Sequence, residues 1–464
     1  MLSSRNCDFG FRSTPRFYQV QFPRSFSHFI LTRRRSCSSS RAGFLQLSYP
    51  NRLIEDKNRI GADRLLNTAA ALFRAKGYAA TTTREIAAAL GIQQASLYYH
   101  AKSKEELLYK VFVFSLEQMQ TQVAAAIAAE QDPLEKIRVF IRTHLAALLA
   151  FQSSNATMMT ELRALSGAYR SDVVARRRNY STLVRTMLEQ AQDAGGVRKD
   201  ISAQYLYLAL LNLLNWSMLW FRTGQELTPD QLANIFTTLF MEGVVAVDLK
   251  QSLAGSTPAA VETMGVRQAD PRRVGRETSR RLLVVAAALF AKKGYRLTSM
   301  REIAQGLGIQ KASLYYHTAT KEDLLFKICE ASVTRVLDSA KATIRDTQNP
   351  LDRIRSLISA HVQCVLQDQD LHATALAEMR ELSHERLKIV EATWHEYRDL
   401  LRSVLYDAQN AGLIRENVEI KYAALGLLGM VTRVEVWFRP GGPLSPQQLG
   451  GVFAEIFLTG ARAA

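Results

Sequence analysis

The chain has 464 residues, 47% of them hydrophobic and 22% charged, with a formal net charge of +16 at pH 7 and a sequence pI near 9.7. This basic balance favours an acidic polymer or surface as partner, and no apolar run is long enough for a membrane span. The cysteines are Cys7, Cys37, Cys329 and Cys364. They lack paired spacing and histidines in a metal-binding register, so we expect a reducing compartment and no metal site.

Residues 1–58 form the first segment and hold ten Lys or Arg against three Asp or Glu, with no helical apolar period. A serine-rich stretch follows Arg33, Arg34 and Arg35. Such a composition does not form a packed unit. We expect a disordered basic tail or a translated upstream region, with an organelle transit peptide as the alternative.

From about residue 60 the chain is an internal duplication, in which each residue of the first copy has its equivalent 217 positions later without a gap. Arg84 matches Arg301 and His100 matches His317, and between them only positions 88, 89 and 94 change. The copies span roughly 60–247 and 277–464, and each is long enough to bury its own core.

Residues 248–276 join the two copies and contain few large apolar side chains. Their turn-forming residues are Gly255, Pro258, Gly265, Pro271 and Gly275. We expect a flexible linker, whose r.m.s. span of roughly 30 Å lets one copy fold back on the other.

The pattern within each copy is helical throughout. Apolar residues recur at three- and four-residue spacing from Leu65 to Phe73, and Gly77 ends this first predicted helix. Because no alternating strand pattern of useful length occurs, the predicted class is all-α. We expect each copy to hold a three-helix helix-turn-helix domain followed by a longer helical domain. The predicted domains are 59–107 and 108–247 in the first copy, and 277–324 and 325–464 in the second.

Two short helices follow the first. Thr82 and Glu85 form a capping box that starts the second helix, and Gly91 ends it after barely two turns. A third short helix places Leu97 inward and leaves glutamine, serine and tyrosine side chains to solvent. Ser103 caps the start of a fourth helix. This geometry can place the third helix in a DNA major groove.

These residues resemble the TetR/AcrR family of transcriptional regulators. The resemblance rests on Phe73-x-x-x-Gly77-Tyr78, Thr82-Thr-Arg-Glu-Ile-Ala87, Leu90-Gly-Ile92, Ser96-Leu-Tyr-Tyr-His100 and Lys104-Glu-Glu-Leu-Leu108, and on their counterparts from Phe290 to Leu325. It implies two complete units fused in tandem, in each of which the longer helical domain is an effector and dimerisation domain. The usual aromatic residue after the histidine is absent, because Ala101 and Thr318 stand there.

Double-stranded operator DNA is the partner that this resemblance implies. Gln and Ser can bond base edges, and Tyr and Lys can reach phosphates. The residues expected to face DNA are Thr82, Thr83, Arg84, Gln93, Gln94, Ala95, Ser96, Tyr98, Tyr99, His100 and Lys104 in the first copy, and Ser299, Arg301, Gln310, Lys311, Ala312, Ser313, Tyr315, Tyr316, His317 and Lys321 in the second.

The effector portion resembles family members that respond to acyl-coenzyme A thioesters in lipid or sterol breakdown. The similar stretches include Glu161-Leu-Arg163 and Trp437-Phe-Arg-Pro-Gly-Gly442. Candidate ligand-binding residues are His144, Arg163, Tyr180, Asn212, Trp216, His361, Arg380, Tyr397 and Trp437. The alternative is that the histidines and tryptophans are core residues. Asn212 and Asn215 become Gly429 and Thr432, so we expect the polarity of the two pockets to differ.

By the same resemblance, the late helices, about 202–223 with 228–247 and about 419–440 with 445–462, form an interface between two units. Tandem fusion makes that interface intramolecular, with an effective concentration of about millimolar order. The chain is then a pseudo-dimer, and further self-association stays open.

By the same resemblance, the predicted function is a ligand-released repressor. We expect it to read an imperfect palindrome, because Gln94 stands where the second copy has Lys311. We expect it in the bacterial cytoplasm, associated with the nucleoid, without a cofactor. The alternatives are a multidrug-sensing repressor of an efflux operon and an architectural or dimerisation protein without an effector. The motifs of hydrolases, phosphate loops and zinc proteases are missing, so we predict no enzyme and no catalytic residues.

Overall fold

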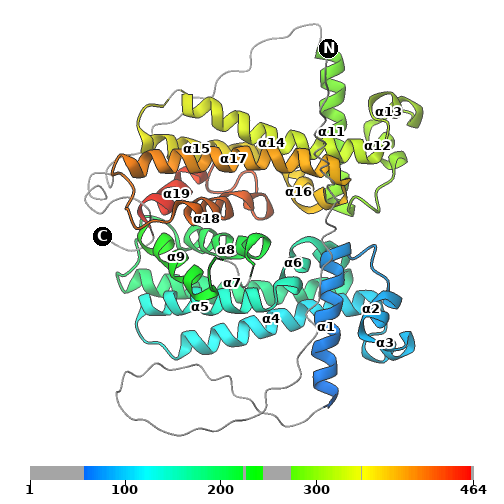
Figure 1. Cartoon of the computed structure of the whole chain (residues 1–464), viewed down its shortest axis with the longest axis horizontal. Coiled ribbons are helices and arrows are strands. Elements are labelled where there is room, and N and C mark those ends of the chain that lie inside the picture. Colours follow the sequence, from blue (N-terminus) through cyan, green and yellow to red (C-terminus); the bar gives the residue numbers. More distant parts are fainter. Residues whose placement is uncertain (1–56, 223–225, 244–272, 346, 461–464) are drawn as a thin grey trace, which may run out of the picture. The chain divides into compact units, whose positions relative to one another are not determined.

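The computed structural model describes residues 57–222, 226–243, 273–345 and 347–460 (Figure 1). Every regular element in these ranges is a helix, which confirms the all-α prediction. Residues 1–56 of the predicted tail and most of the predicted linker lie outside the described residues, whereas Lys57 and Asn58, also predicted as tail, belong to the first helix. None of the described helices has the length and apolarity needed to cross a bilayer.

The first copy contains nine α-helices in its described part, and a 3-10 turn, η1 (Leu162–Ala164), follows the sixth. They are α1 (Lys57–Lys76), α2 (Thr83–Leu90), α3 (Gln94–His100), α4 (Lys104–Ala128), α5 (Pro133–Ala150), α6 (Gln152–Glu161), α7 (Gly167–Asp193), α8 (Ala203–Trp220) and α9 (Pro229–Glu242).

The described part of the second copy repeats this order, with α11 starting inside the stretch predicted as linker. Its helices are α11 (Arg273–Lys293), α12 (Met300–Leu307), α13 (Lys311–His317), α14 (Lys321–Arg345), α15 (Pro350–Gln367), α16 (Gln369–Glu378), α17 (His384–Asn410), α18 (Ile420–Thr432) and α19 (Pro446–Thr459), with the 3-10 turns η2 (Met379–Glu381) and η3 (Val434–Val436).

The copies differ at the late helix predicted to run over about 419–440. In the first copy α8 is continuous to Trp220, whereas α18 ends at Thr432 and η3 replaces its last turn. The second copy places β-branched residues at 431, 432, 434 and 436 in this stretch. Such side chains lose rotamer freedom in a helix, which favours an earlier end.

Three hydrophobic cores hold these helices together. Each DNA-binding unit has its own core, centred on Phe73 with Leu97 in the first copy and on Phe290 with Leu314 in the second. A third core is shared by the effector helices of both copies. Helices α4 and α14 contribute to two cores each, so they run through the predicted domain boundaries at 107/108 and 324/325.

The shared core depends on a close approach of α8 to α18, which pack along each other (Figure 1). A Cβ atom at Gly426 would lie 2.7 Å from Leu213 Cδ1, and one at Gly429 would lie 2.8 Å from Trp216 Cβ. Only glycine permits contacts this short, so these two positions set the separation of the helices. Helices α9 and α19 pack beside them.

The ends of α9 and α19 cross at two equivalent glycines. Gly243 (φ 66°, ψ −161°) and Gly460 (φ 83°, ψ −177°) occupy a backbone region that is essentially restricted to glycine. A Cβ at Gly460 would lie 2.4 Å from Met241 O and 2.6 Å from Gly243 N. A side chain at either position therefore meets the backbone of the other copy.

Two equivalent arginines reach across the same crossing. Arg198 Nη1 donates to Thr459 Oγ1 at 2.6 Å, and Arg415 Nη1 donates to Glu242 Oε2 at 2.5 Å. Arg415 also donates to the carbonyl of Gly243. These cations lie at the C-terminal ends of α9 and α19, where they also complement the helix dipole.

We predict that Gly460→Ala lowers the free energy of unfolding by about 1–3 kcal/mol from backbone strain, and further through the clash with the first copy. Gly412→Ala is the control, because Gly412 also has a positive φ (+71°) but nothing within 4 Å of its Cβ position. Urea denaturation measures both. Equal losses in the two variants would show that the crossing contributes nothing.

Candidate DNA-binding interface and effector region

Local hydrogen bonds fix the start of α2, and a glycine fixes its end. Thr82 Oγ1 accepts from the backbone N–H of Glu85 at 3.2 Å, and the N–H of Thr82 donates to Glu85 Oε2 at 2.8 Å. A hydrogen bond from Lys76, followed by those from Thr82, lowers the pKa of Glu85 to about 2. Gly91 then ends α2 at φ +71°. Ser299 and Glu302 repeat the capping box in the second copy.

The third helix of each unit presents a polar face to solvent. Within α3 and α13 only Leu97 and Leu314 are buried. Tyr99 and Tyr316 are each 90% exposed, which is unusual for an aromatic side chain without a partner surface. The face predicted to meet DNA is therefore accessible in both copies.

The two reading faces differ at the start of the helix. In the first copy Gln94 Nε2 donates to Thr83 Oγ1 at 3.0 Å, and Thr83 Oγ1 lies 3.4 Å from Tyr98 OH. In the second copy Met300 replaces the threonine, and Lys311 Nζ lies 5.7 Å from the ring centre of Tyr315. We call the helix-turn-helix unit of each copy (α1–α3 and α11–α13) its reading head. The head of the first copy thus presents an amide to solvent, and the head of the second copy presents a cation.

Lys104 has intramolecular partners for its ammonium group. Its Nζ donates to Tyr78 O and Thr81 O at 3.0 Å each and to Ala79 O at 3.4 Å, and it lies 4.4 Å from the centre of the Tyr78 ring. Burial lowers its pKa. This lysine braces α4 against the turn before α2, so its phosphate contact stays a prediction.

Lys321 forms the same brace, with 2.9 Å to Tyr295 O and 3.0 Å to Thr298 O. The other predicted DNA residues divide by accessibility. Exposed are Thr82, Arg84, Gln93, Ala95, Ser96, Ser299, Arg301, Gln310, Ala312 and Ser313, whereas Thr83, His100 and His317 are half-buried.

In the first effector domain His144 is a satisfied core histidine. Its Nδ1 lies 2.6 Å from Tyr180 OH, and its Nε2 lies 3.2 Å from Asn215 Oδ1. Burial lowers the pKa of His144 to about 4, so the ring is neutral. Both ring nitrogens have partners, which leaves neither for a ligand without rearrangement.

The second effector domain leaves the equivalent group incomplete. His361 Nδ1 lies 2.7 Å from Tyr397 OH, but Nε2 has no partner, because Thr432 replaces the longer asparagine. Thr432 Oγ1 is also without a partner, and so is Nε2 of the buried His372. Burial lowers the pKa of His361 to about 3. This region holds buried hydrogen-bonding capacity that the first copy lacks.

Arg163 and Arg380 do not join these histidines. Each reaches the other copy at the ends of α1 and α11. Asn212 Nδ2 donates to Met430 O at 3.4 Å, and Trp216 packs on Gly429, so both lie at the contact between copies. Trp437 packs against Phe453 with ring centres 6.1 Å apart. The predicted ligand residues therefore do not form one site.

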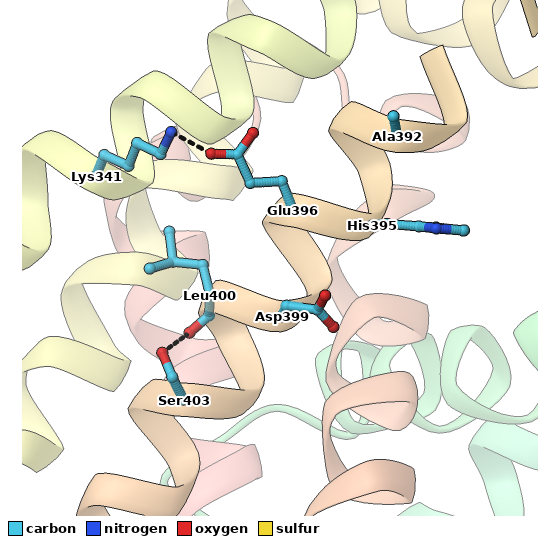
Figure 2. Close-up of a pocket in the computed structure, with 7 residues that line it drawn as sticks. All are labelled: Lys341, Ala392, His395, Glu396, Asp399, Leu400 and Ser403. Carbon is cyan, nitrogen blue, oxygen red and sulfur yellow. Dashed lines mark hydrogen bonds and ion pairs between the residues drawn. The ribbon is translucent and has the colours of Figure 1, made fainter. Parts of the chain in front are cut away.

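A surface groove also occurs in the second copy, between α14 and α17 (Figure 2). It is open, and Lys341 forms an ion pair with Glu396 across it at 2.5 Å. His395 points away from this ion pair in the view. None of the predicted ligand residues lines the groove, so the groove is not the effector site that these residues were predicted to form.

Two buried polar residues were missed by the sequence analysis. Glu435 replaces Met218 of the first copy, and both of its carboxylate oxygens lack hydrogen bonds. His372 replaces Asn155, whose side chain is bonded to Ser115 and Leu148 O. The signal was present in the sequence, because each residue departs from its equivalent 217 positions earlier.

The family follows from two models that match in duplicate. One, described as bacterial regulatory proteins of the tetR family, matches residues 65–111 and 282–328. The other, described as a tetracyclin repressor-like C-terminal domain, matches 130–244 and 347–461. The chain belongs to the TetR family of DNA-binding transcriptional regulators and carries its two-domain unit twice, as the resemblance predicted.

Particular relatives match the length of a single copy. The HTH-type transcriptional repressor KstR2 of Mycobacterium tuberculosis is 32% identical over 196 residues, covering 41% of this chain and 96% of the relative. The solved structure of that ketosteroid regulator matches with a TM-score of 0.37 and 28% identity, over 41% of this chain and 94% of that one. AibR in complex with isovaleryl coenzyme A and operator DNA matches with a TM-score of 0.35 and 28% identity, over 40% and 99%.

We predict that His372→Asn makes stability less dependent on pH. Burial lowers the pKa of His372 to about 4, so the folded chain holds it neutral, whereas the unfolded chain protonates it near pH 6.5. Its contribution is complete above pH 6.5 and is lost as the pH falls toward 4, at about 1.4 kcal/mol per unit. Urea denaturation between pH 7 and 5 measures the slope. The exposed His395→Asn is the control, and equal slopes in both variants would contradict the prediction.

Proposed function

We propose that the chain is a ligand-released repressor in which the two fused units act as an intramolecular pseudo-dimer on two half-sites of one operator. The observation that carries this proposal is the double occurrence of an exposed recognition helix, each fixed by the same capping box. The packing of α8 along α18 supports it further, because it joins the two units through a shared apolar core.

The relatives support the sign of regulation. KstR2 is named a repressor, and 96% of the length of KstR2 matches one part of this chain. The basic composition favours association with DNA at ordinary salt. On this basis we propose that the protein associates with the bacterial nucleoid.

Each recognition helix should be necessary for tight operator binding. We predict that Tyr99→Ala and Tyr316→Ala each weaken binding at least tenfold at about 0.15 M salt, because each removes contacts of one of two reading heads. Tyr406→Ala is the control, since Tyr406 is 49% exposed on α17, outside both heads. Fluorescence anisotropy measures the affinities. Unchanged affinity in either head variant would contradict two-handed binding.

The two half-sites should differ in sequence. Gln94 can pair bidentately with adenine, whereas the Lys311 cation prefers guanine acceptors or phosphate, with about 1–3 kcal/mol for a good contact. We predict that selection from random DNA yields an imperfect palindrome, and that Lys311→Gln makes it more symmetric. A symmetric consensus for the unchanged chain, retained in the variant, would show that these side chains do not read bases.

For the effector, we propose an acyl-coenzyme A thioester or another amphipathic acid, held by the second copy. The resemblance in the effector portion supports the class. The assignment to the second copy is supported by His361 Nε2 and the Thr432 hydroxyl, which have no hydrogen-bond partner. A polar group of a ligand can supply that partner. In the first copy, both ring nitrogens of the equivalent His144 already have partners.

Calorimetry with a panel of acyl-coenzyme A thioesters tests this assignment. We predict one binding site per chain and release of DNA on binding. His361→Phe should abolish binding, and the matched variant His144→Phe should keep it. Two equal sites would overturn the assignment to one copy. No binding to any thioester, with DNA released by a cationic drug, would favour the multidrug-sensing alternative.

A further inference from the structure

Arg163, in the turn after α6, places its guanidinium group entirely against the second copy. Its Nη1 donates to Phe290 O at 3.2 Å and to Ala291 O at 3.5 Å, and its Nη2 forms an ion pair with Glu378. The side chain lies close to Gly294, where a Cβ would be 3.3 Å from Nη2. All of these partners adjoin or belong to the end of α11 and the start of η2.

Arg380 is the equivalent residue of the second copy and makes the reciprocal contact. Its Nη1 donates to Arg74 O at 3.2 Å, in the last turn of α1. The last carbonyls of a helix have no partners within it and attract a cation. Each arginine thus binds the C-terminal end of the helix that braces the other copy's reading head.

The Arg163 half of this pair is buried. Glu378 is only 6% exposed, and Arg163 opposes the rise in its pKa that burial causes. Removal of the Arg163 cation while the contact stays closed would leave a buried carboxylate unpaired, which is strongly unfavourable. A cavity of about 400 Å³ adjoins both Glu378 and Arg380, and Glu161 accepts from the N–H of Tyr78 there.

We propose that Arg163 and Arg380 are positioning residues that fix the separation of the two recognition helices and thereby determine which half-site spacing the chain accepts. The inference rests on the proposed reading of two half-sites. Helix α1 packs against α2, and α11 packs against α12. A contact at the ends of α1 and α11 therefore acts on both heads at once. Each arginine follows an effector helix of its own copy and contacts the helix-turn-helix unit of the other copy, so it also links the effector domain of one copy to the DNA-binding unit of the other.

A series of operators with half-sites moved apart or together by one or two base pairs tests the proposal. The unchanged chain should lose roughly fivefold or more in affinity at non-optimal spacings, the size of a typical coupling between sites. Arg163→Met should bind all spacings within about twofold of one another, while its affinity for a duplex with a single half-site stays the same. Arg176→Met is the control, because Arg176 pairs with Glu117 and Asp172 inside the first copy.

The outcomes separate the inference from the proposed function. If the unchanged chain prefers one spacing and Arg163→Met keeps the same preference, the positioning role is wrong and two-handed reading stands. If the unchanged chain binds one half-site as tightly as two, the proposed function itself fails. Should Arg163→Met not fold, as shown by circular dichroism, Arg380→Met removes a single hydrogen bond and should broaden the spacing preference in the same direction.

Discussion

The close approach of α8 to α18 is the constraint on which the rest of the structure depends. Gly426 and Gly429 leave no room for a Cβ against the first copy, and the backbones at Gly243 and Gly460 nearly touch. The apolar side chains of both effector domains then form one core, so neither copy can move without exposing it. Arg198 and Arg415 add polar contacts between the copies at the ends of α9 and α19, and Arg163 and Arg380 add others at the ends of α1 and α11. They act on helix termini, where a cation has unpaired carbonyls to bind.

The two copies keep the same order of helices, apart from the earlier end of α18, while their side chains have diverged. Both heads have the same capping box, the same left-handed glycine and the same exposed tyrosines. The differences between the heads include Gln94 against Lys311 and Thr83 against Met300. In the effector domains the divergence lies among buried residues. His361 Nε2 lacks the hydrogen-bond partner that His144 Nε2 has in Asn215. A fused chain can hold such asymmetry, whereas identical subunits cannot.

The sequence predicted what local spacing and the repeat determine. The helices, the capping boxes at Thr82 and Ser299, and the inward Leu97 follow from patterns within a few residues. It did not predict that Arg163 and Arg380 leave their own domains, or that Lys104 binds three carbonyls of a neighbouring turn. Those contacts join residues far apart in the chain. The sequence also does not distinguish a lysine or arginine that binds a phosphate from one that binds a backbone carbonyl. The early end of α18 depends on a cluster of β-branched residues whose effect is small at each position.

The central claim is that one chain supplies both reading heads. Native mass spectrometry of the protein with a duplex that carries two half-sites tests it most directly, because the mass of the complex counts the chains. The account predicts one 52.0 kDa chain on each duplex, with no second chain added as protein is raised to a modest excess. A complex that holds two chains on the same two half-sites, each contributing one head, would contradict it.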